Sequence, residues 1–254
     1  MVADADLPVA ATRTSMRILE TLVDLDGGGV TAIAEALDRS KSSVHDHLQT
    51  LVGLGVVVKD GHEYRLGLRF LRLGEFARSQ YPMYEAGIEE VQQLSTAAGC
   101  AAGMAVLEGD SVVCLHHRLG PEAGSPRLAA GDRLPVHCTA PGKAILAALP
   151  EARREDILAD HPFAAGTDQS HAKRADLAAE LRTVTARGLA VDREEWEPDR
   201  RGIAATVTGP DGGVAGAIYL LTGSESHSGK RFQQDFPGLV ISSATRIRNA
   251  LRDA

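Results

Sequence analysis

The clearest amphipathic pattern in the chain begins at Ser40. Val44, Leu48 and Leu51 recur at positions i, i+4 and i+7, so one face of a helix formed here is apolar. The opposite face carries side chains that can hydrogen-bond a base edge or a phosphate, namely Lys41, Ser42, His45, Asp46 and Gln49. Ser40 is suited to cap such a helix, and glycines follow it. The pattern predicts a helix that is buried on one side and presents polar groups on the other.

Two shorter helical patterns precede this segment. An apolar stripe that starts near Thr14 predicts a first helix, which the run Gly27–Gly29 ends. Thr31 is expected to cap a short second helix, and Asp38-Arg39 is expected to form the turn into the third. His47, on the third helix, fits either a DNA contact or packing against the first helix.

A β-hairpin is predicted directly after these helices. Val56–Val58 is β-branched, Glu63–Leu66 alternates, and turn residues lie between them. Helix, helix, turn, helix and hairpin is the order of a winged helix-turn-helix, which favours DNA reading over the ordinary alternative of a solvated helix face. Three side chains on the hairpin would reach phosphates or the minor groove. The candidate DNA-binding residues are Thr31, Arg39, Ser40, Lys41, Ser42, Ser43, His45, Asp46, Gln49, Lys59, His62 and Arg65.

The rest of the chain predicts an α+β domain with a mostly antiparallel sheet. Tyr81-Pro82 interrupts a helical pattern that starts at Leu68, and a long helix is expected at Met83–Ala98. Apolar runs separated by turn residues predict two hairpins, with strands at Cys100–Leu107, Ser111–His116, Ile203–Thr208 and Val214–Leu221. The remaining patterns predict helices at Glu151–Ala159 and Lys173–Ala186, a strand at Leu189–Asp192 and a closing helix that ends near Leu251.

Composition agrees with a globular protein and restricts the function classes. The 254 residues suffice for two domains with a core each. No apolar run approaches the roughly 20 residues of a membrane span, and residues 1–12 lack the basic start of a signal peptide, so a cytoplasmic protein is expected. The net charge of −7 argues mildly against nucleic-acid binding, so DNA binding must depend on local placement of donors. The three cysteines have no C-x-x-C spacing and are expected to be reduced and mostly buried.

A second candidate site lies where Pro141 opens a helix. Thr139 or Ala140 would precede this helix, and free N–H groups at such a start can bind a carboxylate or a phosphate. Ala140 and Gly142 are small enough to let a ligand approach the backbone. The alternative is an ordinary capped helix, and Lys143 fits either an anion contact or a salt bridge.

Acidic, histidine and cysteine side chains suggest further chemistry. Asp192 and Glu194 would share a face if their strand continues, and two carboxylates there could orient a ligand hydroxyl or amide, act as an enzymatic pair, or form a solvated acidic loop. His116-His117 and His137-Cys138 contain zinc-ligand types. Adjacent histidines on a strand point to opposite faces, however, and neighbours such as His137 and Cys138 rarely have the geometry of an activated nucleophile. Neither a metal nor another cofactor is expected.

Taken together, these segments resemble the IclR family of transcriptional regulators from about Thr14 to Leu251. The carrying motifs are Ser40–His45 with Leu48–Leu51, Tyr64–Gly67, Leu134–Ala144, Arg187–Glu195 and Gly202–Ala205. The resemblance implies an N-terminal winged helix-turn-helix, a linker helix and a C-terminal GAF-like domain with an antiparallel sheet flanked by helices. The expected divisions are a mobile N-terminal arm at 1–12, a DNA-binding domain at 13–67, a linker helix at 68–81 and an effector-binding domain at 82–254.

The resemblance also implies partners and a ligand. Members are dimers through the DNA-binding half and often tetramers through the effector half, and they bind near-palindromic operators whose half-sites lie roughly 34 Å apart. Their effectors are mostly small organic acids, aromatic acids or sugar-derived metabolites. The expected effector-binding residues combine the positions that the family implies with the candidates at the helix start and on the strand. They are Leu134, His137, Cys138, Thr139, Ala140, Pro141, Gly142, Asp192, Glu194, Gly202, Tyr219 and Leu221.

The chain departs from the family pattern at three of these positions. Gly202 stands where members that bind very small keto acids carry a cysteine, and Tyr219 and Leu221 stand where they carry serines. The loss of hydroxyl donors favours an aromatic acid or a larger sugar acid over glyoxylate or pyruvate, although Tyr219 could equally close an unused pocket. The expected function is an effector-controlled, sequence-specific transcriptional regulator and not an enzyme. The alternatives are an enzyme that uses Cys138 or the Asp192/Glu194 pair, and a metabolite sensor that acts through protein partners.

Overall fold

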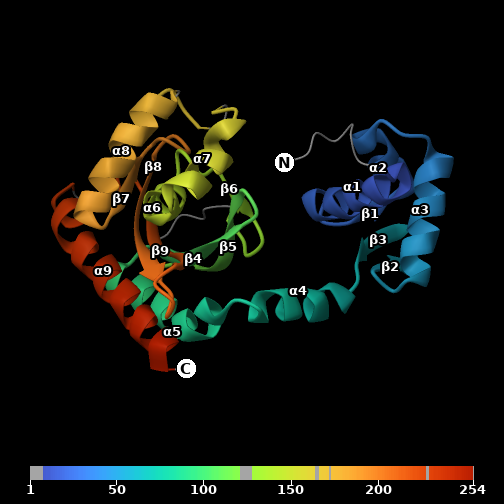
Figure 1. The fold of residues 1–254 in the computed structure, drawn as a ribbon. Coiled ribbons are helices and arrows are strands. Elements are labelled where there is room, and N and C mark those ends of the chain that lie inside the picture. Colours follow the sequence, from blue (N-terminus) through green and yellow to red (C-terminus); the bar gives the residue numbers. More distant parts are fainter. Residues whose placement is uncertain (1–7, 121–127, 164–165, 172, 227–228, 254) are drawn as a thin grey trace. The chain divides into compact units, whose positions relative to one another are not determined.

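The computed structural model describes residues 8–120, 128–163, 166–171, 173–226 and 229–253. The chain divides into two compact units, residues 1–80 and residues 81–254 (Figure 1). The first unit is a helical domain with a small sheet, and the second is an antiparallel sheet covered by helices. The predicted mixed fold class is confirmed.

Unit 1 is a winged helix-turn-helix. Its elements are α1 (Ala10–Asp24), α2 (Val30–Leu37), α3 (Lys41–Gly53) and a sheet of β1 (Gly28–Gly29), β3 (Glu63–Leu66) and β2 (Val57–Asp60), followed by α4 (Arg69–Ser79). Ile18, Ile33 and Leu48 come from the three different helices and are fully buried together in one apolar core. The predicted apolar face of α3 therefore holds the helix against α1 and α2.

Three predictions in unit 1 need correction. The first helix begins at Ala10 and not at Thr14, so Ala10–Thr12 are helical and do not belong to an arm; residues 1–7 lie outside the described residues. Gly28 and Gly29 do more than follow a helix, because they pair with Tyr64 and Glu63 as a third strand of the wing sheet. Since this pairing holds Gly29 extended, α2 starts at Val30, and Thr31 lies inside its first turn and does not cap it.

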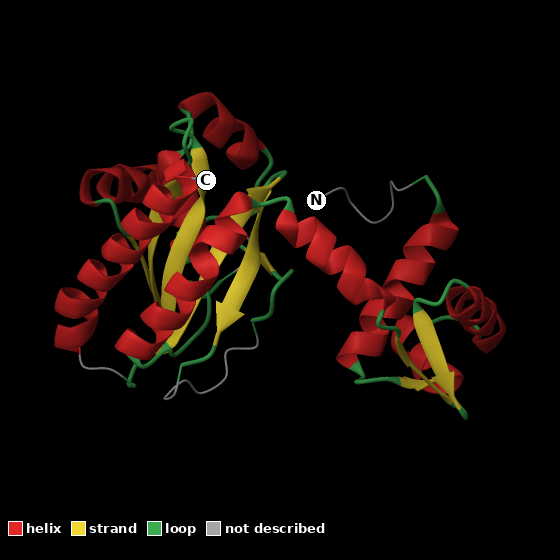
Figure 2. Ribbon diagram, turned by 90° about the horizontal axis from the view of Figure 1, so that it is seen from below, coloured by secondary structure: helices red, strands yellow, loops and turns green. Residues whose placement is uncertain are grey.

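Unit 2 is built on one six-stranded sheet in the order β6-β5-β4-β9-β8-β7, with every neighbouring pair antiparallel (Figure 2). The strands are β4 (Ala101–Glu108), β5 (Ser111–Arg118), β6 (Arg133–Leu134), β7 (Ala190–Arg193), β8 (Arg200–Thr208) and β9 (Val214–Gly223). The two predicted hairpins correspond to β4-β5 and β8-β9.

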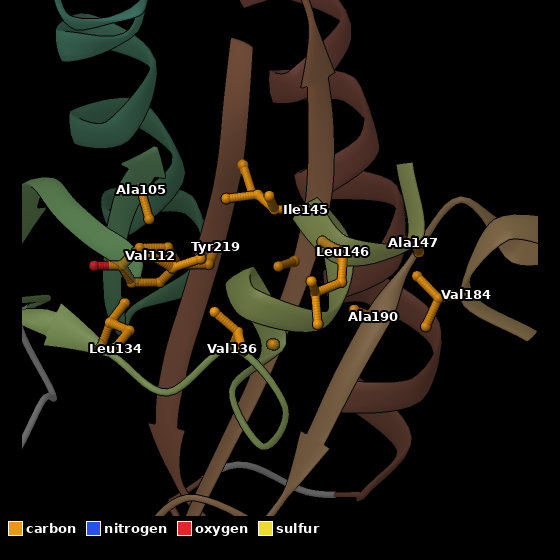
Figure 3. Close-up of a cluster of buried hydrophobic side chains, with 14 of the residues drawn as sticks. Ala105, Val112, Leu134, Val136, Ile145, Leu146, Ala147, Val184, Ala190 and Tyr219 are labelled. Carbon is orange, nitrogen blue, oxygen red and sulfur yellow. The ribbon is translucent and has the colours of Figure 1, made fainter. Parts of the chain in front are cut away.

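Helices cover both faces of this sheet. One face packs against α5 (Pro82–Ala98) and α9 (Gly229–Asp253), and the other packs against α6 (Ala140–Ala148), α7 (Glu151–Ala159) and α8 (Arg174–Arg187). Figure 3 shows part of the apolar cluster between the sheet and α6, α7 and α8, where the α6 side chains Ile145 and Leu146 lie over the sheet. Within the described part of the chain, no helix is both long and apolar enough to cross a membrane.

Strand register sets two rows of side chains on the α6 face. Asp192, Gly202, Leu221 and Ala101 pair successively across β7, β8, β9 and β4. A parallel row runs through Ala190, Ala204, Tyr219, Gly103 and His117. Most residues in both rows are glycine or alanine. The larger side chains on this face of the sheet are Leu221, Tyr219, Asp192 and His117.

Candidate DNA-reading helix and effector site

The polar face of α3 is exposed along its whole length. Ser40 caps the helix as predicted, since its Oγ accepts a hydrogen bond from the Ser43 N–H at 3.3 Å. His45 lies within 3.3 Å of the Gln49 side chain and 3.7 Å of the Asp46 carboxylate. These contacts join neighbours on one solvent-facing surface, so the groups remain accessible to a partner.

The structure decides between the two roles considered for His47. Its ring is half-buried, and Nδ1 lies 2.9 Å from the Ser15 hydroxyl of α1. His47 therefore packs against the first helix and is not on the exposed face.

The remaining DNA-binding candidates surround this helix within unit 1. Thr31 and Arg39 are exposed at the first turn of α2 and in the turn before α3. On the hairpin, Lys59, His62 and Arg65 are exposed, and the Lys59 ammonium lies 5.5 Å from the ring centroid of Tyr64. All the candidates thus belong to one helical domain and its wing.

The start of α6 is a capped helix, which limits its use as an anion site. The Thr139 hydroxyl donates to the Pro135 carbonyl at 2.7 Å and accepts from the Gly142 N–H at 3.1 Å. Pro141 has no N–H, so two of the first-turn positions offer no free donor. A side chain on Gly142 would overlap the Val136 backbone, so this glycine serves close packing of the chain and not ligand approach.

Lys143 forms the salt bridge and not an anion contact. Its side chain is fully buried, and Nζ donates to both carboxylate oxygens of Glu195 at 2.6 and 2.7 Å. A Glu180 oxygen lies 3.7 Å from the same nitrogen. The pair ties α6 to the segment that follows β7.

The predicted Asp192/Glu194 pair is wrong. Strand β7 ends at Arg193, and Glu194 has a φ of 64°, which turns the chain away from the strand. Glu194 is half-exposed and lies 3.6 Å from Arg201. The second buried carboxylate is Glu195, which strand alternation does not predict because β7 ends at Arg193.

Asp192 is nearly fully buried, at 1% exposure, and is held by backbone groups. Its Oδ1 accepts from the Glu195 N–H at 2.8 Å and from the Trp196 N–H at 3.4 Å. Burial raises the pKa of Asp192 to about 7, and the negative charge of Glu195 adds to this, while the Glu195 N–H and Lys143 oppose it. Asp192 is therefore able to change its charge near neutral pH.

Cys138 and His137 are both fully buried side chains. Burial, together with the charges of Asp192 and Glu195, raises the pKa of Cys138 to about 12, so it stays a thiol. His137 packs against His161 and Phe163, with 2.8 Å between His137 Nδ1 and His161 Nε2. All three cysteines are buried and outside disulfides, as predicted. No group of three or more potential metal ligands occurs in the part of the chain that the structure describes.

The adjacent histidines on β5 point to opposite faces, as predicted. The His116 ring contacts Tyr84 of α5, with 5.9 Å between the ring centroids, whereas His117 contacts Tyr219. The two rings therefore cannot face one metal ion.

Four of the effector candidates meet at Gly202. A Cβ placed there would lie 3.1 Å from Leu221 Cδ2, 3.2 Å from Ala140 Cβ and 3.5 Å from Asp192 Cβ. Tyr219 lies in the next row, with its ring over Gly103, and Leu134 belongs to the same apolar cluster (Figure 3). The sheet and α6 thus bring Ala140, Asp192, Gly202 and Leu221 together, while Glu194 lies apart and His137 packs elsewhere.

A winged helix-turn-helix joined to a helix-covered sheet with a buried polar patch is the architecture of a two-domain transcriptional regulator. The family model for the bacterial transcriptional regulator IclR C-terminal domain matches residues 79–249, and the model for the IclR helix-turn-helix domain matches residues 12–61. The chain belongs to the IclR family, whose members are DNA-binding transcription regulators with a C-terminal effector-binding domain.

Relatives and solved structures agree with this assignment. The chain is 27% identical to the probable HTH-type transcriptional regulator ArcR of Halobacterium salinarum, over 97% of this chain and 95% of the relative. It is 32% identical to the probable transcriptional regulator SauR of Cupriavidus necator, over 73% and 75%. The fold is shared with the Thermotoga maritima IclR (TM-score 0.80, 19% identity, 95% and 97% covered). It is also shared with an IclR homologue from Microbacterium hydrocarbonoxydans in complex with 4-hydroxybenzoate (TM-score 0.81, 21% identity, 96% and 100% covered).

Proposed function

We propose that the regulator reads its operator with the polar face of α3 and contacts phosphates with the β2-β3 hairpin. The two different faces of α3 support this proposal. Val44 and Leu48 on one face are fully buried, while Lys41, His45 and Gln49 on the other face are exposed. A helix held by one face in a rigid core can enter a major groove with the other. The acidic net charge makes binding depend on these local groups.

The protein acts as a homodimer, and pairs of dimers form a tetramer through the effector-binding units. The support for the dimer comes from α4, which buries none of its residues within the chain. Its large apolar side chains Leu71, Leu73 and Phe76 are 53–69% exposed. Large apolar side chains exposed along a helix that buries no residue within its own chain are typical of a protein interface. A twofold dimer would place two α3 helices in successive major grooves of a near-palindromic operator.

The effector is an aromatic acid or a larger sugar acid that binds at Ala140, Asp192, Gly202 and Leu221. The small residues Ala140 and Gly202 bring the start of α6 and β8 into close contact beside Asp192, a buried polar group that changes charge near neutral pH. The complex of a related structure with 4-hydroxybenzoate supports an aromatic carboxylate. Differential binding of the effector to two arrangements of the protein would shift its operator affinity.

The protein works in the cytoplasm as a regulator and not as an enzyme. The family is one of transcriptional regulators, the Cys138 thiol is buried and protonated, and Glu194 does not join Asp192. These features do not activate Cys138 as a nucleophile and do not form an Asp192/Glu194 pair.

A gel shift on the DNA upstream of the chain's own gene tests the function. Specific retention that weakens with salt and changes with a bound metabolite is the expected result. Screening organic acids by thermal shift identifies the effector, and stabilisation by pyruvate alone would contradict the proposed class. Asp192→Ala should weaken the effector response and leave DNA affinity in its absence unchanged.

A further inference from the structure

Three side chains on the α6 face of the sheet form a hydrogen-bonded chain beside the effector candidates. The Tyr219 hydroxyl lies 3.3 Å from Cys114 Sγ and 3.2 Å from His117 Nδ1. The rings of Tyr219 and His117 are nearly parallel, with an interplanar angle of 23°. Gly103 lies between them in register, and a side chain on it would overlap the Tyr219 ring. The glycine therefore makes this contact possible.

The direction of the hydrogen bonds follows from which groups keep their protons. Burial raises the pKa of Cys114 to about 11 and the pKa of Tyr219 well above its ordinary value, so both remain protonated. Burial, with the nearby His116 and Arg200, lowers the pKa of His117 to about 4, so its ring is neutral. An imidazole nitrogen is a far better acceptor than a thiol sulfur. Tyr219 therefore donates to Nδ1 of His117, and the remaining ring proton is on Nε2.

This Nε2–H group is a buried donor without an acceptor. The atom is shielded from solvent and has no hydrogen-bond partner among the residues that the structure describes. Buried donors in folded proteins are almost always paired, so an orphaned one requires an explanation, such as a ligand or an ordered water that accepts from it. A carboxylate is the strongest acceptor that a small organic ligand can offer to a neutral N–H.

We propose that His117 donates a hydrogen bond from Nε2 to a carboxylate oxygen of the effector, with Tyr219 and Cys114 fixing the ring in the tautomer that donates. This inference rests on the proposed effector function of unit 2 and adds a residue on β5 to its site. It also gives Tyr219 a role: the phenol orients a ligand-binding histidine and does not merely fill an unused pocket.

Two substitutions of one residue separate ligand binding from a structural role. The amide nitrogen of Gln can occupy the place of Nε2, whereas the side chain of Asn reaches only the place of Nδ1. His117→Gln therefore keeps the donor to the ligand, and His117→Asn keeps the contact with Tyr219. His116→Asn is the matched control, because His116 faces α5 on the other side of the sheet.

The probes are benzoate, 4-hydroxybenzoate and gluconate, with benzyl alcohol as an analogue that lacks the carboxylate. Affinities are measured by calorimetry on the full chain, and the His117 ring is followed by ¹⁵N NMR. We expect a carboxylate, but not benzyl alcohol, to shift the Nε2 resonance. We expect His117→Asn to weaken carboxylate binding by more than about tenfold, while His117→Gln and His116→Asn stay within about threefold of the parent.

Two results would overturn the proposal. One is an Nε2 resonance that none of the carboxylates moves, and the other is an Asn variant that binds as the parent does while the Gln variant fails. The second pattern would assign His117 a purely structural role through Tyr219. Neither result touches the proposed regulatory function, because operator binding is measured separately by gel shift and would persist.

Discussion

Lys143 and Glu195 form a buried ion pair between residues 52 positions apart in the sequence. Both carboxylate oxygens of Glu195 accept from the lysine, and the N–H of Glu195 also binds Asp192. One ion pair therefore links α6 to the loop that holds the buried Asp192. The position of Asp192, the carboxylate proposed to contact the effector, therefore depends on this ion pair.

Removal of Lys143 should destabilise unit 2 strongly. Lys143→Met leaves Glu195 buried without its hydrogen-bonded counter-charge, which costs about 3–5 kcal/mol in comparable cases. Denaturant unfolding of the parent and the variant measures the change. The double variant Lys143→Met/Glu195→Gln should recover part of the loss, because Glu195 then no longer leaves an isolated buried charge. Equal stability of the parent and the single variant would contradict the pairing.

Asp192 should make stability depend on pH between about 4 and 7. Its pKa is raised in the folded protein to about 7 from the ordinary value of 3.8, so the folded state binds the proton more tightly than the unfolded state. The resulting stabilisation is complete below pH 4 and is lost as the pH rises through about 7. Asp192→Asn, which cannot titrate, should remove this part of the pH dependence in unfolding titrations. A parallel pair of stability curves would show that the pKa of Asp192 is not raised.

The exposed face of α3 should carry operator specificity. Lys41→Ala combined with Gln49→Ala should abolish specific retention in a gel shift, because both side chains lie on the polar face and neither is buried. Melting temperature and effector-induced stabilisation should stay as in the parent, since the core contacts of α3 remain. Lys230→Ala, an exposed change on α9 in the other unit, is the control. Unchanged operator affinity in the double variant would refute the assignment of this face.

The apolar surface of α4 should hold the dimer together. Phe76→Glu places a charge on a side chain that is 69% exposed in the single chain, so it should leave each chain folded while it weakens self-association. Sedimentation velocity would then show a shift toward the monomer, together with weaker operator binding. Arg72→Ala, an exposed polar change on the same helix, should keep the parent's association. A Phe76→Glu protein that sediments as the parent does would exclude this surface as the interface.

Local patterns in the sequence were enough to predict most of the elements. The period of Val44, Leu48 and Leu51 predicts α3, and the Ser40 cap follows from the chemistry of its side chain. The turn residues around Gly109 and Gly212 predict the two hairpins. Such features depend on residues close together in the chain, so the sequence by itself determines them. The family motifs, read in chain order, then predict a DNA-binding unit followed by an effector-binding unit.

Contacts between distant segments were decided only by the tertiary structure. Gly29 pairs with Glu63 and so moves the start of α2, although Thr31 looks like a cap. The left-handed backbone at Glu194 ends β7, which makes Glu195 and not Glu194 the buried partner. Burial of a lysine, the pKa of Asp192 and the orphaned nitrogen of His117 all depend on which side chains exclude water from them. The periodicity of apolar residues shows which face of an element is apolar, but it does not show which distant residues that face will contact.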